Sequence, residues 1–165
     1  MKEDSIEVWR KKKTAYKKQN KKFIKQLQQH KGKRLDTYAN ELTEETFKKV
    51  DCLQCANCCS SIPPIVNKTD ANRIAKHLKM KPAEFEEKYL RVDEDGDTVI
   101  NTSPCPFLGE DNYCQIYEVR PKACREYPHT DAQQFSDNLH LHAPNAQYCP
   151  AVFHILEEMK KHIPV

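Results

Sequence analysis

Cysteines are the residues of this chain best suited to chemistry, and there are eight of them among 165 residues. Four stand in one short run, Cys52-Leu53-Gln54-Cys55-Ala56-Asn57-Cys58-Cys59. A Cys-x-x-Cys step allows a tight loop to turn its thiolates toward one metal centre. Cys58 and Cys59 are adjacent and their side chains diverge, so the two can serve different centres or two faces of one. The remaining candidate ligands are Cys105, Cys114, Cys124 and Cys149.

Eight thiols can form disulfides or bind metal, and the redox compartment decides between these outcomes. The first residues, Met1-Lys2-Glu3-Asp4-Ser5-Ile6-Glu7, lead into Trp9-Arg10-Lys11-Lys12-Lys13 without an apolar segment, so we expect neither a signal peptide nor a membrane span. We therefore expect a cytoplasmic protein with reduced thiols. Leu, Ile, Val and Phe make up 33 of the 165 residues, a thin supply for a core, so metal binding would also reinforce the fold.

The number of cysteines matches two four-thiolate sites, but their spacing does not assign ligands to each site. Tight Cys-x-x-Cys knuckles favour zinc. A Cys-x-x-Cys-x-x-Cys run with a distant Cys-Pro, here Cys105-Pro106 or Cys149-Pro150, is typical of bacterial ferredoxins. We therefore expect an iron-sulfur cluster ahead of zinc, with either metal compatible with the pattern.

Charge is divided unevenly along the chain. Residues 2–34 hold 13 Lys and Arg against 3 acidic residues, a net charge of +10, whereas residues 35–165 hold 14 against 21, a net charge of −7. The basic segment could bind nucleic acid or an acidic protein, and the alternative is a solvated helix face. We treat residues 1–34 as a basic helical arm and residues 35–165 as the cysteine domain.

Several elements are expected to position the cysteines. Apolar residues at a three-four spacing predict an amphipathic helix over residues 5–30 that ends near Gly32, with Ile6, Trp9, Tyr16, Phe23 and Leu27 on its inner side. Further helices are predicted from Thr43, from an N-cap at Thr69, from Pro82, and over residues 150–162. Residues 98–100 and 113–117 have strand composition and predict a small hairpin, while 93–97 form an acidic turn. Adjacent prolines after the cysteine run exclude helix there, so we expect the run to lie on irregular backbone. The fold class is thus α+β and helix-rich, a small single domain with a long basic N-terminal helix.

Three blocks of this sequence resemble the YkgJ-type CxxCxxCC cysteine-cluster family. They are Cys52 through Cys59, Ser103-Pro104-Cys105-Pro106-Phe107-Leu108 with Cys114-Gln115-Ile116-Tyr117, and Arg120-Pro121-Lys122-Ala123-Cys124-Arg125-Glu126-Tyr127-Pro128. The resemblance spans residues 50–150 and implies a zinc- or iron-chelating domain related to the cysteine-rich part of flagellin lysine methylases. The family often has glycine where this chain has Ala56, which affects the expected loop geometry and not the ligands.

Arg120 and Arg125 flank Cys124 closely in the sequence. A four-thiolate centre carries net negative charge, which a guanidinium can offset while donating hydrogen bonds to sulfur. We expect both arginines to support the metal centre in this way. The alternative is an ordinary ion pair with Glu118 or Glu126.

Histidine could replace a thiolate in a mixed site. His140 and His142 alternate around Leu141 and would point the same way from a strand, so one of them is a candidate ligand. His77 and His154 lie in helical patterns and are expected at the surface or half-buried.

Three functions are compatible with these patterns. The first is a structural or carrier metal protein, in which metal-binding energy is folding energy. The second is a cluster-dependent enzyme of redox or methyl-transfer chemistry, although no phosphate loop, nucleophile-base pair or nucleotide fingerprint is present. The third is a zinc-stapled adaptor that binds RNA or a protein partner through the basic helix, in which Trp9, Tyr16 and Phe23 would be buried rather than stack on bases.

Overall fold

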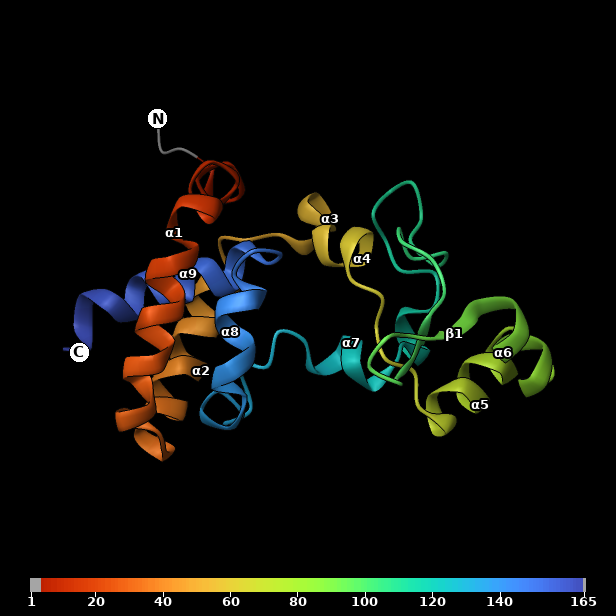
Figure 1. Ribbon diagram of the computed structural model, residues 1–165. Helices are drawn as coiled ribbons and strands as arrows, with labels where there is room; N and C mark the ends of the chain where they lie inside the picture. Colours follow the sequence, from red (N-terminus) through yellow and green to blue (C-terminus); the bar gives the residue numbers. More distant parts are fainter. Residues whose placement is uncertain (1–3, 165) are drawn as a thin grey trace. The chain divides into compact units, whose positions relative to one another are not determined.

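The computed structural model describes residues 4–164, which form two compact units. Unit 1 comprises residues 4–52 and 128–164, and unit 2 runs from Leu53 to Tyr127. The expected fold class is confirmed: the chain is helix-rich, with several short helices, a two-stranded antiparallel hairpin and a long N-terminal helix (Figure 1). The boundary between an arm of residues 1–34 and a domain of residues 35–165 stays a prediction.

Unit 1 is built from helices. Helix α1 packs on α8 and α9, and α2 also packs on α9. Two 3-10 turns, η1 (Gln28–His30) and η3 (Ser136–Asn138), complete the unit. The helices are α1 (Ser5–Leu27), α2 (Lys33–Phe47), α8 (Leu139–Asn145) and α9 (Pro150–His162), and the last of these has the bounds predicted from the sequence.

The apolar stripe of α1 is the main contribution of this helix to the core of unit 1. Ile6, Trp9, Phe23 and Leu27 are buried, and the Trp9 indole donates a hydrogen bond from Nε1 to the Ala146 carbonyl at 2.8 Å. Each such side chain stabilises the fold by about 1.5–3 kcal/mol through burial. The predicted packing of this stripe on its own chain is confirmed. Within residues 4–164, no helix combines the length and the apolar character needed to cross a bilayer.

The second helix begins earlier than the sequence indicated. We predicted a start at Thr43, but α2 begins at Lys33, directly after Gly32, whose φ of 138° favours glycine. Thr43 lies inside this helix, where its hydroxyl donates to the carbonyls of Ala39 at 2.7 Å and Thr130 at 3.2 Å. The prediction was wrong because burial of Leu35 and Ala39 extends the helix through a segment without a capping signal.

Unit 2 has a core of its own beside the cysteines. The Phe107 ring lies 4.8 Å from Tyr89 and 6.4 Å from Phe85, between centroids. Cys105 and Cys114 pack against the edge of this core. Its elements are α3 (Cys52–Cys55), which begins in unit 1, α4 (Asn57–Ser61), α5 (Lys68–His77), α6 (Pro82–Tyr89), β1 (Leu90–Val92), β2 (Thr98–Ile100), η2 (Tyr117–Val119) and α7 (Lys122–Glu126).

The predicted N-cap of the helix after the cysteine run needs correction, whereas the predicted start of the next helix does not. The N-cap of α5 is Asn67 and not Thr69, because the Asn67 side chain accepts the Asp70 N–H at 2.7 Å and Asp70 in turn accepts the Asn67 N–H at 3.3 Å. This reciprocal arrangement satisfies two helix-end donors. By contrast, α6 begins at Pro82 as predicted.

The hairpin contains one of the predicted strands but pairs it with a different partner. Strand β2 pairs with β1, not with residues 113–117, and the predicted acidic turn joins the two strands. The Asp93 carboxylate accepts the N–H groups of Asp95 and Asp97 at 3.0 and 2.9 Å, which closes this turn. Residues 113–117 make only an isolated bridge, between Leu108 and Cys114, because a tight loop holds them.

Candidate metal centre

The cysteine run folds into the short helices α3 and α4 rather than the irregular backbone that we predicted. Ala56 separates the two helices in a left-handed conformation, with φ 45° and ψ 18°. The Ser60 N–H returns to the Ala56 carbonyl at 3.1 Å, and the Ile62 N–H to the Cys58 carbonyl at 2.8 Å. Glycine adopts this left-handed conformation with less strain than alanine, so Ala56 holds the turn between α3 and α4 at some cost in backbone strain.

A compact loop carries Cys105 and Cys114 toward the same region. The Cys105 N–H donates to the Cys59 carbonyl at 2.9 Å, so the first and second cysteine segments are joined directly. The Leu108 N–H donates to the Cys105 carbonyl at 3.1 Å, and Leu108 forms the bridge with Cys114. The Gly109 N–H donates to the carbonyl of Tyr113 at 2.9 Å and narrows the loop. These backbone contacts hold both thiols near α4.

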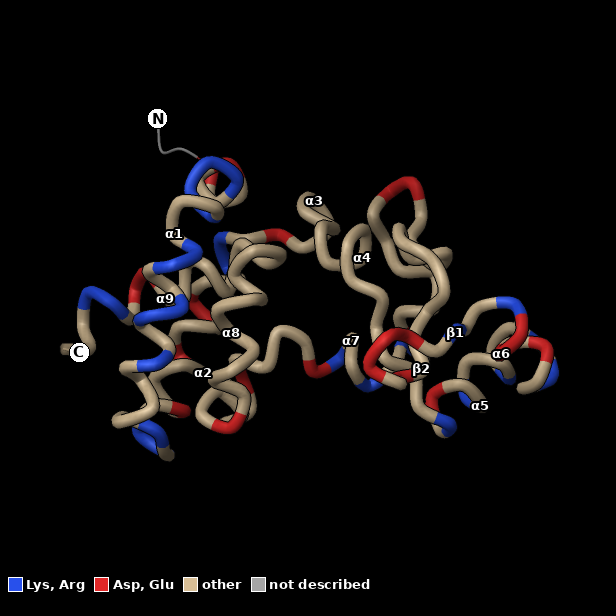
Figure 2. Tube along the Cα trace, in the orientation of Figure 1, with Lys and Arg blue, Asp and Glu red and all other residues tan. Residues whose placement is uncertain are grey.

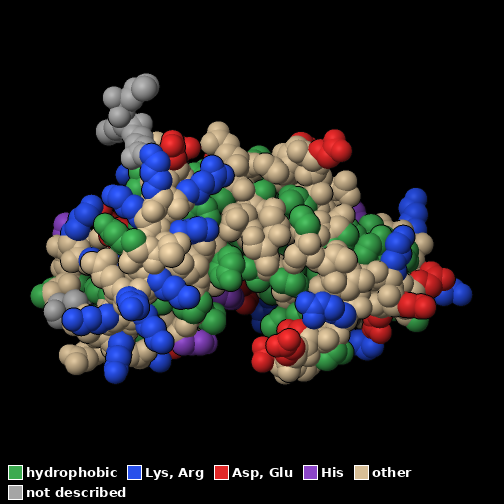
Figure 3. Space-filling view, turned by 45° about the horizontal axis from the view of Figure 1, so that its top comes forward, with side chains coloured by type: hydrophobic (Ala, Val, Ile, Leu, Met, Phe, Trp, Pro, Cys, Tyr) green, Lys and Arg blue, Asp and Glu red, His purple; other side chains and the backbone are tan. Residues whose placement is uncertain are grey.

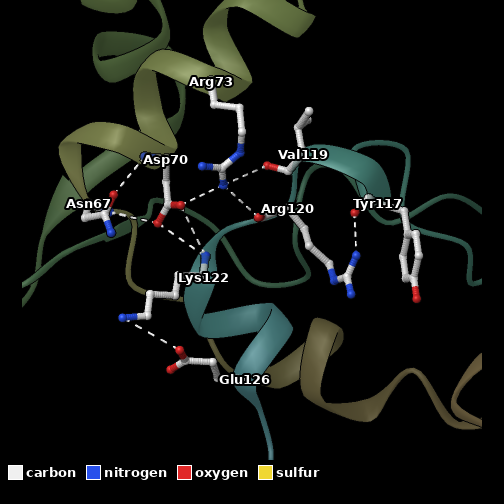
Figure 4. Close-up of polar contacts among 8 residues, drawn as sticks. All are labelled: Asn67, Asp70, Arg73, Tyr117, Val119, Arg120, Lys122 and Glu126. Atoms are coloured by element: carbon white, nitrogen blue, oxygen red, sulfur yellow. Dashed lines mark hydrogen bonds and ion pairs between the residues drawn. The ribbon is translucent and has the colours of Figure 1, made fainter.

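Helix α7 supplies the third cysteine segment, and a buried carboxylate anchors the start of this helix (Figure 4). The Asp70 side chain is 3% exposed, pairs with Arg73 at 2.7 Å and accepts the Lys122 N–H at 3.2 Å. Arg73 also donates to the carbonyls of Val119 and Arg120, at 3.3 and 2.9 Å. We call this the Asp70–Arg73 clamp. It ties α5 to the backbone between η2 and Cys124, and the sequence analysis missed it because the residues that it joins are far apart in the chain.

Four thiols from these three segments lie within electrostatic range of one another, and every pair among them interacts. We call this set the cysteine quartet: Cys59, Cys105, Cys114 and Cys124. All four are free of disulfide bonds. The sequence could not pair these residues, because 65 positions separate the first from the last.

The quartet has one ionisable thiol and three that resist ionisation. The Cys58 thiol donates a hydrogen bond that lowers the pKa of Cys59 to about 7, against the opposing effect of burial. Burial raises the pKa of Cys105 and of Cys114, and the negative charge of the Cys59 thiolate raises both further. Although residue Cys124 as a whole is exposed, burial of its thiol raises the pKa to about 12, and the other three thiols of the quartet act in the same direction. Four thiolates are thus costly to hold together without a cation.

The positive charge of Arg120 acts on this cluster, because it lowers the pKa of both Cys114 and Cys124. Its Nη1 donates to the Tyr117 carbonyl at 2.7 Å, and its guanidinium lies 4.0 Å from the centroid of the Tyr117 ring (Figure 4). Arg125 is exposed on α7, and the neighbouring Glu126 pairs with Lys122 at 3.6 Å. The alternative role, an ion pair of Arg120 or Arg125 with Glu118 or Glu126, stays a prediction; the cation that pairs with Glu126 among the described residues is Lys122.

The four cysteines outside the quartet differ in solvent exposure and in the element that carries them. Cys52 is exposed at the start of α3, Cys55 is half-buried at its end, and Cys58 donates to Cys59 as described above. Cys149 is buried in unit 1 as the N-cap residue of α9. Among residues 4–164, no group of three or more Cys, His, Asp or Glu side chains is placed so that it could hold a metal ion.

The histidines that we considered as ligands have other positions. His140 and His142 lie on helix α8 and not on a strand, so they do not share a side. His142 is fully buried in unit 1, stacked on Phe135 with 4.0 Å between ring centroids, and its Nε2–H donates to the Phe135 carbonyl at 2.9 Å. The alternation was misleading because a helix turns 100° per residue. As predicted, His77 is exposed and His154 is half-buried.

A helix-rich fold with thiols gathered from three separate segments defines a small protein of the cysteine-cluster class. The model of the CxxCxxCC family, described as a "putative zinc- or iron-chelating domain", matches residues 51–150, and the chain belongs to this family. The resemblance identified from the sequence is confirmed. No curated protein and no solved structure gives a significant match to the chain. The family description supports chelation of zinc or iron, and the match does not extend to the basic helix α1.

Proposed function

We propose that the cysteine quartet binds one metal centre through four thiolates. The observation that supports this proposal is the mutual interaction of all four thiols, which come from three segments far apart in the sequence. Sulfur donors in this number suit zinc or an iron-sulfur cluster. Because the thiols are not yet placed as a ligand set, metal binding would draw their side chains toward one another.

An iron-sulfur cluster is the favoured occupant, with zinc as the alternative. Cys105, which is followed by proline in the ferredoxin manner, belongs to the quartet. Arg120 would offset the negative charge of the loaded quartet, and Arg125 is proposed for the same supporting role from the exposed side of α7. Metal binding by the remaining cysteines stays a prediction, and it concerns Cys52, Cys55, Cys58 and Cys149.

The role proposed for this centre is structural or carrier rather than catalytic. A complete set of four protein ligands leaves no open position for a substrate. The quartet borders the small core of unit 2, through Cys105 and Cys114, so metal binding there would add directly to the stability of this core. Reduced thiols such as these persist in the cytosol, which is the location that we propose. A cluster-dependent methyl transfer or redox reaction is the competing function, and it requires a centre that accepts an external ligand.

The test is anaerobic purification followed by visible spectroscopy and elemental analysis. Broad visible absorbance with iron and sulfide identifies a cluster, whereas a colourless protein with stoichiometric zinc identifies zinc. Each Cys→Ser variant of the quartet is expected to lose this centre, and Gln115→Ala, at an exposed position beside Cys114 that is not a candidate ligand, is expected to retain it. Full metal content in all four quartet variants would disprove the ligand assignment. A spectral change of the loaded protein with cyanide or imidazole would favour the enzyme over the structural role.

A further inference from the structure

The outward face of helix α1 carries a band of positive charge. All of its cations in this band are exposed, and Glu7 is the acidic residue of the helix. Figure 2 shows Lys and Arg recurring along α1, and Figure 3 shows basic side chains spread over the surface of the same unit. We call this band the basic face: Arg10, Lys11, Lys17, Lys18, Lys21, Lys22 and Lys25.

Helix geometry aligns the centre of the basic face. Residues seven apart return to nearly the same side of a helix after about 10 Å of rise, so Lys11, Lys18 and Lys25 form a row. Lys21 and Lys22 lie on either side of this row, because successive residues are about 100° apart. The row therefore presents positive charge along one side of the helix, which is complementary in sign to a nucleic-acid backbone.

Lys11 of the basic face pairs with Glu7 at 3.4 Å, whereas, among the described residues, five other lysines of this face lack the carboxylate partners that lysines have elsewhere in this chain. Lys48 pairs with Glu45 at 2.7 Å and Lys161 with Glu158 at 2.8 Å, each within its own helix. Within the described part of the chain, the lysines at 17, 18, 21, 22 and 25 have no ion pair, and they face one another at i,i+3 and i,i+4 spacing. Like charges at these spacings destabilise a helix. A bound polyanion would offset this repulsion more strongly than solvent and small ions do.

The composition of the basic face favours a duplex over other polyanions. The aromatic residues of α1 lie on its inner side: Trp9 and Phe23 are buried, and the Tyr16 ring packs 5.7 Å from that of Phe153. A single strand is bound mainly by stacking on exposed aromatic rings, which this face does not offer among the described residues. The core of a protein interface is poor in lysine and rich in large apolar residues, and those are also missing from the described surface of α1.

We propose that the basic face of α1 binds the phosphate backbone of double-stranded nucleic acid without reading its sequence. Lysine ammonium groups contact phosphates as point charges, and affinity comes from counterion release. Binding of this kind is weak at physiological salt, with Kd in the range of about 10⁻⁴–10⁻⁶ M. The proposal goes beyond the metal centre and does not depend on it, because all of the residues concerned belong to unit 1.

The test is fluorescence anisotropy of the full-length protein, as purified with its metal, on labelled 24-base-pair DNA and RNA duplexes of random sequence at 25–200 mM KCl. We expect binding to both duplexes or to one of them, with log K falling linearly against log salt. The triple variant Lys18→Gln, Lys22→Gln, Lys25→Gln should reduce the steepness of that line by about three, since each lost phosphate contact removes about 0.9. Its affinity at 50 mM KCl should fall at least tenfold.

The matched control is Lys76→Gln, Lys79→Gln, Lys81→Gln, which removes the same charge from exposed positions of unit 2. It should leave affinity and salt dependence within twofold of the unaltered protein. The proposal is overturned if the two triple variants behave alike, if no duplex binding occurs at 50 mM KCl below about 10⁻⁴ M, or if a single strand binds more tightly than the duplex. Tighter binding of a polyglutamate peptide of equal charge would overturn it in favour of an acidic protein partner. Circular dichroism of both variants verifies that α1 is intact.

Discussion

Acidification is expected to destabilise unit 1 through His142. This side chain is fully buried, stacked on Phe135, and held by one hydrogen bond from its Nε2–H to the Phe135 carbonyl. Its Nδ1 has no hydrogen-bond partner among the described residues. Burial is the main cause that lowers the pKa of His142 to about 4. The imidazole is therefore neutral in the folded protein at pH values where an exposed histidine is already protonated.

The size of this effect follows from the two pKa values. In the unfolded chain His142 has the ordinary pKa of about 6.5. Between pH 6.5 and 4 the unfolded chain binds a proton that the folded chain does not, so the free energy of unfolding falls as the pH falls. Each pKa unit corresponds to about 1.4 kcal/mol, which gives a total of about 3 kcal/mol. The contribution is complete above pH 6.5 and lost at about pH 4.

The measurement is urea unfolding at intervals from pH 7.5 to 4.5, followed by the fluorescence of Trp9. Trp9 is the single tryptophan of the chain and is buried in unit 1, so its emission reports on this unit. His142→Gln should flatten the pH dependence by about 2–3 kcal/mol across this range. His140→Gln, at an exposed position of the same helix, should leave the dependence unchanged. Parallel pH profiles for His142→Gln and the unaltered protein would refute the reasoning.

Three further results are expected. Asp70→Asn should destabilise unit 2 by about 2–3 kcal/mol, because it leaves Arg73 without its buried carboxylate partner. Glu86→Gln, which removes an exposed ion pair, should cost less than about 1 kcal/mol. Urea unfolding followed by circular dichroism compares the two variants, and equal losses of stability would contradict the role of the clamp. In metal-free protein, iodoacetamide should modify Cys59 with a rate that is half-maximal near pH 7, while Cys124 stays unreactive at that pH. Peptide mapping by mass spectrometry separates the two thiols. Faster modification of Cys124 than of Cys59 would contradict the lowered pKa of Cys59 and the raised pKa of Cys124. Loading the metal-free quartet with metal at pH 7 should release about three to four protons, since one thiol is half-ionised and the others are protonated. The protons are measured in weakly buffered solution. Release of fewer than two protons would exclude four thiolate ligands.

Elements with a local signal could be predicted from the sequence. Helix α9 has its predicted bounds and α6 its predicted start, because a proline in the first turn and regular apolar spacing specify them within a few residues. The inner stripe of α1 was predicted for the same reason. The acidic segment 93–97 was correctly read as a turn, since short acidic side chains satisfy backbone N–H groups locally.

Elements that depend on distant partners could not be predicted in this way. The partner of β2 is β1 because α6 delivers Leu90 to the edge of the core, which no strand signal near Leu90 indicates. The alternation of His140 and His142 suggested a strand, but both lie on helix α8, where the His142 ring stacks on Phe135. The Asp70–Arg73 clamp joins residues about 50 positions apart and leaves no local pattern.

The candidate site also has features that the local sequence predicts and features that depend on residues distant in the chain. Residue type and spacing alone were sufficient to identify the candidate cysteines and the family, because the spacing of metal ligands is a property of short segments. Which of the eight thiols influence one another's pKa values depends on the tertiary structure. The backbone hydrogen bond from Cys105 to Cys59 and the anchoring of Cys124 on α7 bring together charges whose interaction depends on distance in space and not along the chain.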